Sequence, residues 1–239
     1  MGKYFLISFF LLCFVKSQAQ VNNDSIIVNN DSTIVNNDSL IDLKYLEDQL
    51  YLSLTYSILN DKPSEISQNG FSGGFSLGFI KDIPLNEQRN FGIAIGAGYA
   101  YNVYVQNLKI SRENQTSSFE LAEDYKTNRF GISAIEVPIE LRWRTSTPQK
   151  YSFWRVYGGL KVAYLINEKT KFEDASGLIT TKNLSEFNKF QYGVILAAGY
   201  STWNLYLYYG ISPLFKNSVF NERNLDLKDI NVGLKFYIM

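Results

Sequence analysis

Runs of residues that alternate between apolar and small or polar side chains recur from residue 49 to the end of the chain. This period of two is typical of β-strands with one face in an apolar environment. Eight such runs are present, each about ten residues long or longer, which is the length that a tilted strand needs to cross a bilayer. Single-chain bacterial barrels have even strand numbers. The pattern therefore predicts an all-β fold, an eight-stranded antiparallel transmembrane β-barrel over residues 49–239.

Alternation alone does not distinguish a membrane barrel from a soluble barrel, which has its apolar face inside. Two features favour the membrane. The side chains opposite the apolar face of each run are Gly, Ala and Ser or a mixture of Glu and Arg. Such side chains suit a narrow lumen better than a solvated surface. The connections also alternate in length, as outer-membrane barrels with long external loops and short periplasmic turns do. The long ones are 59–70, 107–129, 167–186 and 212–228, and the short ones are 84–90, 145–150 and 201–202. We expect an outer-membrane location with both ends of the barrel in the periplasm.

The charged residues of the central runs share the parity that is predicted to face inward. They are Glu136, Glu140, Arg142, Arg144, Arg155 and Lys161. The interior of an eight-stranded barrel is only wide enough for side chains to fill it. We therefore predict that these residues form an ion-paired plug in the lumen rather than the lining of an open pore.

Two alternatives for these residues stay open, catalysis and a polar ligand site. The backbones of Glu136 and Glu140 are about 13 Å apart along a strand, which is wider than the carboxylate pair of a glycosidase. Pro138 between them removes one ladder hydrogen bond, so we expect a β-bulge there.

The N-terminal 48 residues differ in composition from the rest. Residues 1–19 have the positive start, short apolar run and small-residue end of a signal peptide. Leu12 precedes Cys13, which disfavours lipidation. Residues 20–48 contain three seven-residue repeats built on Val-Asn-Asn-Asp-Ser, which favours turns over helix. We interpret them as a flexible periplasmic linker, and a partner-binding arm or weak cation site is the alternative.

The composition of the chain after residue 19 excludes several kinds of chemistry. It contains neither cysteine nor histidine, so disulfides, the usual zinc and haem sites, and triads with a histidine base have no residues to form them. Lys and Arg together number 23, as do Asp and Glu, and no basic stripe indicates nucleic-acid binding. We predict no enzyme activity and no cofactor.

Four segments resemble the PorT family of outer-membrane proteins of Bacteroidota, whose gliding members are called SprT. They are residues 136–161, 69–99, 189–210 and the ending INVGLKFYIM. The most specific stretch carries Arg142, Trp143, Arg144, Thr145, Ser146, Thr147 and Pro148, followed by Trp154. The resemblance implies a non-enzymatic component or assembly factor of the type IX secretion system, in some members supporting gliding. It implies protein partners in that machinery. From the predicted barrel we further expect outer-membrane lipid around it and insertion by the barrel-assembly machinery.

Other functions remain alternatives at this point. The long loops 107–129 and 167–186 permit an adhesin or other surface-binding barrel, and a small porin-like protein is a further possibility. Small barrels that modify lipid A use a histidine-containing site, which this chain lacks. If the chain serves secretion, loop 107–129 and residues 21–48 are the expected contact surfaces, with plain solvated loop as the alternative for both.

Overall fold

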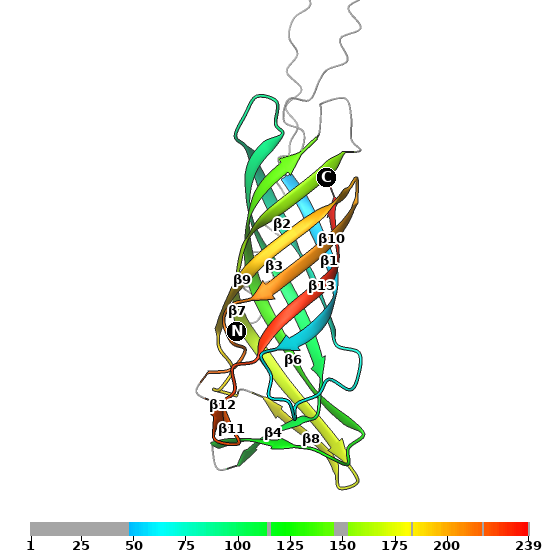
Figure 1. Cartoon of the computed structure of the whole chain (residues 1–239), viewed down its shortest axis with the longest axis vertical. Coiled ribbons are helices and arrows are strands. Elements are labelled where there is room, and N and C mark those ends of the chain that lie inside the picture. The colour runs from blue at the N-terminus through cyan, green and yellow to red at the C-terminus, as the bar shows by residue number, and fades with distance from the viewer. Residues whose placement is uncertain (1–47, 114–115, 146–152, 183, 217, 239) are drawn as a thin grey trace, which may run out of the picture. The chain divides into compact units, whose positions relative to one another are not determined.

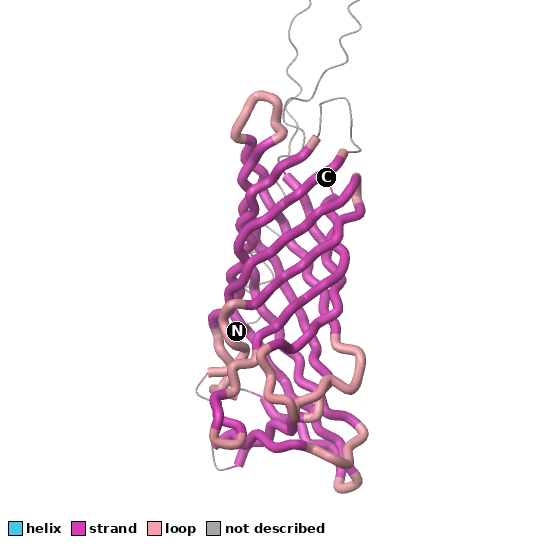
Figure 2. Tube along the Cα trace, in the orientation of Figure 1, coloured by secondary structure: helices cyan, strands magenta, loops and turns pink. Residues whose placement is uncertain are grey.

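The computed structural model of the protein describes residues 48–113, 116–145, 153–182, 184–216 and 218–238. The regular secondary structure of the described residues is strand throughout (Figure 2). No described helix is long and apolar enough to cross a membrane. The predicted signal peptide and all of the predicted linker except Asp48 lie outside the described residues.

Eight long strands form the wall of a barrel (Figure 1). They are β1 (Asp48–Asn60), β2 (Gly73–Pro84), β3 (Phe91–Val105), β6 (Thr127–Arg144), β7 (Trp154–Asp174), β9 (Phe190–Tyr200), β10 (Trp203–Gly210) and β13 (Lys228–Ile238). Neighbours run antiparallel in the order β6-β3-β2-β1-β13-β10-β9-β7, and pairing of β6 with β7 closes the ring. The predicted fold class is confirmed.

The apolar parity of each strand faces out of the barrel. Leu205 is 71% exposed and Leu50 is 57% exposed, whereas Glu140 is 1% exposed. A soluble barrel would have the opposite arrangement, so the exposed apolar belt is the surface that lipid covers. Aromatic side chains flank the belt, with Trp154 packed on Tyr200 and Trp203 on Phe236 at the end of the short turns.

The two ends of the barrel differ. The turns 85–90 and 201–202, the last residues of β6 and the first residues of β7 lie at the end where β1 begins and β13 stops, at the top of Figure 1. The opposite end carries five short strands (Figure 1). They are β4 (Leu108–Glu113), β5 (Thr116–Leu121), β8 (Gly177–Lys182), β11 (Val219–Phe220) and β12 (Arg223–Asn224).

The long connections fold over their end of the barrel as a cap with its own apolar core. Phe130, Phe187 and Phe215 pack together, with ring centroids 4.6 to 5.8 Å apart. Leu108 and Ile110, from the segment 107–129, are buried in the same core. The alternative of a plain solvated loop is therefore wrong for Leu108, Ile110 and Phe119 of segment 107–129, which pack into this core. Leu121 of the β4–β5 hairpin stays exposed.

The predicted β-bulge at Pro138 is also wrong. The pairing of β6 with β3 keeps one register on both sides of Pro138, from Ile95 opposite Ile139 to Gly98 opposite Glu136. The irregularity is an extra residue in β7. Ala134 of β6 pairs with Leu165 of β7, whereas the preceding β6 residue, Ser133, pairs with Asn167, so Ile166 has no partner in the register. Two consecutive β7 residues, Ile166 and Asn167, are both exposed there. A ladder can lose one proline hydrogen bond without inserting a residue, whereas an extra residue reverses the facing of the strand beyond it.

Candidate functional site

Charged side chains fill the lumen in layers, and the layer nearest the short turns joins β2 to β6. Arg144 Nη1 pairs with Asp82 Oδ2, and Arg144 Nε donates to the backbone carbonyl of Arg89 at 2.7 Å. Arg142 Nη1 lies 3.7 Å from the same Asp82 carboxylate oxygen. All three side chains are about 1% exposed or less. One buried carboxylate thus serves two arginines that point inward from alternate positions of β6.

The next layer centres on Glu140. Arg142 donates to Glu140 Oε2 through Nε at 3.0 Å and Nη2 at 2.8 Å. The other oxygen, Oε1, accepts from Lys235 Nζ at 2.9 Å and from the Tyr237 hydroxyl at 3.0 Å. Gln49 Oε1 accepts a further hydrogen bond from Arg142. Both carboxylate oxygens are therefore occupied by donors from β6 and β13.

The third layer holds Glu136 and Lys161. Lys161 Nζ lies 3.2 Å from Glu136 Oε2 and 3.9 Å from the centroid of the Tyr208 ring. The Tyr51 hydroxyl donates to Glu136 Oε1 at 2.8 Å. Gly98 gives the Tyr51 ring its space, because a Cβ at that position would collide with the Tyr51 hydroxyl. Small residues on β3 thus make room for a large inward side chain from β1.

The polar layer nearest the cap connects the lumen to it. Asp229 Oδ2 accepts from the Tyr104 hydroxyl at 3.1 Å and from Asn231 Nδ2 at 2.9 Å. Ser57 Oγ donates to Asn231 Oδ1 at 2.6 Å. The Tyr104 ring stacks on Phe130 of the apolar core, with centroids 4.8 Å apart. A continuous column of packed side chains therefore extends from the short turns to the cap.

Arg155 does not join the ion-paired set in which the sequence predicted it. Its guanidinium carbon lies 4.5 Å from the centroid of the Phe153 ring. Its Nε and Nη1 atoms are buried and have no hydrogen-bond partner among the described residues. Arg142 and Arg144 on the neighbouring strand β6 pair with the nearby carboxylates. Arg155 therefore packs against aromatic rings.

Little space is left in this column. Buried charges are tolerated when they are paired and hydrogen-bonded, and Glu136, Glu140, Arg142, Arg144 and Lys161 are in ion pairs. A cavity beside Lys161 and Tyr206 measures about 10 Å³, which is the room for one water molecule. Among the described residues no group of three His, Cys, Asp or Glu side chains is placed to hold a metal ion.

Sequence reasoning missed half of this network. Gln49, Tyr51, Asp82, Lys235 and Tyr237 take part, although the predicted plug contained charged residues of the central runs only. The parity that places Leu50 and Leu234 outward also places these residues inward. Assigning every second residue of all eight runs to the lumen, and not only those of the central runs, would have found them.

The stretch that carries the family resemblance closes the hairpin between β6 and β7. Trp143 and Trp154 are exposed on the outer face. The backbone amide of Thr145 donates to the carbonyl of Trp154 at 2.9 Å, and Thr145 Oγ1 accepts from the Trp154 amide at 3.1 Å. Ser146, Thr147 and Pro148 lie outside the described residues. The described part of the stretch thus anchors one short turn.

Comparison with known families agrees with this architecture. The family model described as "Outer membrane protein beta-barrel domain" matches residues 18–216. The chain belongs to this family. Membership assigns the barrel to the outer membrane, as the exposed apolar belt requires.

The other comparisons add little to this assignment. The chain is similar to the crystal structure of Ail, the attachment invasion locus protein of Yersinia pestis, with 12% sequence identity and a TM-score of 0.36. That similarity covers 81% of this chain and 98% of Ail. Neither value supports a functional inference. The comparison with curated proteins returned no match.

Proposed function

We propose that this outer-membrane barrel is a non-enzymatic component or assembly factor of the type IX secretion system, acting through protein contacts beside the export channel. The filled lumen supports contacts beside the channel instead of export through the barrel. Lys235 and Glu140 bridge this lumen from opposite walls. A protein substrate needs a wide channel, and a column of paired side chains supplies none. The resemblance of residues 136–161 to the PorT family supports the choice of secretion system.

The capped end offers a surface for such contacts. β8 pairs with β7 and stands at the end of the strand order, so its other edge has no strand neighbour among the described residues. Leu178 is 59% exposed and Ile179 is 45% exposed on this strand. Open strand edges are templates for strand addition by a partner. In our proposal the short-turn end faces the periplasm and the capped end faces outward.

The test compares secreted and periplasmic proteins after deletion of the gene. Proteins bearing the type IX export domain are expected to accumulate in the periplasm and to be exported again when the wild-type gene is restored. Complementation with Leu178→Lys/Ile179→Lys is expected to leave the barrel inserted and export impaired. Leu50→Ala on the lipid face serves as the matched control. Unchanged export in the deletion strain would refute the secretion role.

An adhesin or other binding barrel is the second candidate. The exposed apolar side chains of the capped end favour it. They are Leu121, Leu178, Ile179 and Val219. Soluble domains seldom leave several large apolar side chains exposed together without a partner. Binding of cells to surfaces that falls with Leu178→Lys/Ile179→Lys, while export stays unchanged, would favour this candidate.

A further inference from the structure

Four cations lie on the outer face of the barrel wall beyond the apolar belt. Arg129 on β6 stands opposite Lys171 on β7, and Lys169 on β7 stands opposite Lys182 on β8. Like charges directly opposite each other across strands destabilise a sheet. None of the four side chains makes a hydrogen bond or ion pair within the described part of the chain. The folded chain by itself therefore leaves this positive charge uncompensated.

Several other surface lysines have carboxylate neighbours. Lys81 lies 3.3 Å from Asp48, and Lys228 lies 2.8 Å from Asp61. By contrast, the neighbouring cations, Lys171 first, lower the pKa of Lys169. The cluster therefore brings four cations together on a chain with zero formal net charge.

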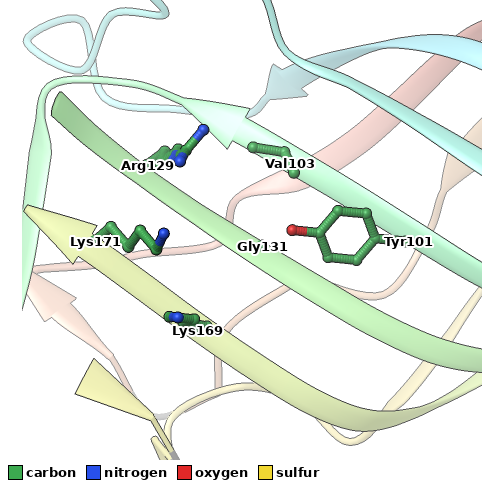
Figure 3. A pocket seen from close by; sticks show the side chains of 6 residues that line it. All are labelled: Tyr101, Val103, Arg129, Gly131, Lys169 and Lys171. Atoms are coloured by element: carbon green, nitrogen blue, oxygen red, sulfur yellow. The ribbon is translucent and has the colours of Figure 1, made fainter. Parts of the chain in front are cut away.

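Three of the four cations, Arg129, Lys169 and Lys171, line a hollow of about 180 Å³ (Figure 3). The hollow is lined by Tyr101, Val103, Arg129, Gly131, Lys169 and Lys171. Gly131 forms part of its floor, and a Cβ there would lie 2.8 Å from the Tyr101 hydroxyl oxygen. Figure 3 shows that hydroxyl directed toward Gly131, with Lys171 and Lys169 on the neighbouring strand. The hollow depends on a glycine at this position.

The hollow adjoins the lipid-covered belt. Ile135 and Tyr164 are paired, exposed residues of that belt. Gly131 is four residues further along β6, about 13 Å by strand rise and about 10 Å along the membrane normal at the usual tilt. The hollow therefore begins at the depth of the polar headgroups. Tyr101 is at the border, where aromatic rings with a polar group are favoured.

We propose that this basic hollow binds the phosphate-bearing headgroup of a membrane lipid. The guanidinium of Arg129 suits a phosphate through paired hydrogen bonds, and Lys169 and Lys171 add point charges. Val103 and Tyr101 cover the root of an acyl chain. A phosphate bound there offsets the positive charge of Arg129, Lys169 and Lys171, which the ligand-free wall leaves uncompensated. A lipid contact at this hollow does not depend on the secretion role of the barrel.

Native mass spectrometry of the full-length protein in detergent tests the proposal, with bis-phosphorylated lipid A and phosphatidylcholine as probes. Wild type is expected to retain lipid A in preference to phosphatidylcholine. Lys169→Gln/Lys171→Gln is expected to weaken lipid A binding by about tenfold or more, because two charge-assisted contacts are lost. The matched control Lys81→Gln/Lys216→Gln has the same change in charge elsewhere on the surface and is expected to bind as wild type does. Equal binding by both double variants would overturn the proposal.

A shape variant and two competitors identify the ligand. Gly131→Leu keeps every cation but fills the hollow, and it is expected to lose lipid A as well. Retained binding in that variant would show a diffuse charge effect and overturn the site. Inorganic pyrophosphate or hexaglutamate that binds wild type as tightly as lipid A does would overturn the lipid assignment in favour of a free phosphate or an acidic peptide.

Folding of the variants is checked independently. Heat-modifiable migration in gels reports an intact barrel, and thermal unfolding without ligand reports its stability. Lys169→Gln/Lys171→Gln is expected to unfold at the same temperature as wild type or higher, since a repulsion has been removed. A lower unfolding temperature would mean that the lysines stabilise the wall, which contradicts the proposal.

Discussion

Lys235 Nζ lies 2.9 Å from Glu140 Oε1, and the two residues come from strands on opposite sides of the barrel. Their contact spans the lumen, so one wall is held against the other by a buried ion pair. Lys235 also lies 4.5 Å from the centroid of the Tyr51 ring. The pair is part of a packed interior and is not an isolated bridge.

Removal of the shared carboxylate should be more damaging than removal of one cation. Glu140→Gln leaves Lys235 without its anion and leaves Arg142 with only Asp82, 3.7 Å away. Breaking such a buried pair destabilises by about 3–5 kcal/mol. Lys235→Met should have a smaller effect, because Glu140 keeps Arg142 and the Tyr237 hydroxyl. Urea unfolding in detergent measures both free energies of unfolding, with exposed Lys81→Met as control. Equal losses in all three variants would contradict the layered network.

Two strand glycines should respond in opposite ways to the same added methyl group. A Cβ at Gly98 would collide with the Tyr51 hydroxyl and lie 2.6 Å from the Leu77 carbonyl oxygen. At Gly158 the nearest atoms are 3.9 Å away. We expect Gly98→Ala to reduce the yield of folded barrel, whereas Gly158→Ala is neutral or slightly stabilising because it lowers the chain entropy of the unfolded state. Heat-modifiable migration after refolding measures the yield. Similar yields for the two variants would show that Tyr51 is not confined as described.

Removal of the Phe215 ring should destabilise the cap while the barrel stays folded. Phe215 is buried between Phe130, Phe187 and Phe119. Phe215→Ala is expected to destabilise the cap by about 3–5 kcal/mol through the cavity that it leaves. Limited proteolysis should then cut residues 184–227 faster, while gel migration still reports a folded barrel. Phe71→Ala, on an exposed ring, is the control. Loss of the barrel itself would mean that cap and barrel unfold as one unit.

The filled lumen predicts that the protein does not conduct. Planar bilayers containing the purified barrel are expected to show no large, stable channel steps. The described lumen column contains paired charges, and the cavity beside Lys161 measures about 10 Å³. Stable single-channel conductance in wild type would restore the porin-like alternative.

The pKa of Lys169 should lie below that of an ordinary lysine, because Lys171, Lys182 and Arg129 oppose its positive charge. Since the folded pKa is lowered, folding carries a penalty at pH values below it. That penalty is relieved as the pH rises through the folded pKa toward the unfolded value. NMR of ¹³C-methylated lysines measures the titration, with Lys169→Arg to assign the signal. Lys171→Gln is expected to raise the pKa of Lys169, and an unchanged value would show that Lys171 is not what lowers it.

The period of two determined the number of barrel strands and the shared face of Glu136, Glu140 and Lys161. The small or mixed-charge side chains of that face and the alternating connection lengths then predicted that it lies inward. Parity is a local property, set by the alternation of side chains along an extended backbone. It carries no information about which inward residues meet. Lys235 reaches Glu140 because the ring closes in one register, and Arg155 lies among aromatic rings because Asp82 and Glu140 are taken by its neighbours.

Only the tertiary structure decided what happens beyond the membrane belt. The parity of β7 before the bulge, continued unchanged, would have directed Glu168, Thr170 and Phe172 outward. The extra residue at Ile166 and Asn167 reverses the strand, so those side chains are buried. Lys169 and Lys171 consequently face outward beside Arg129. A one-residue insertion in the pairing exchanges the two faces of a strand, and its position follows from packing against the cap, which no local pattern records.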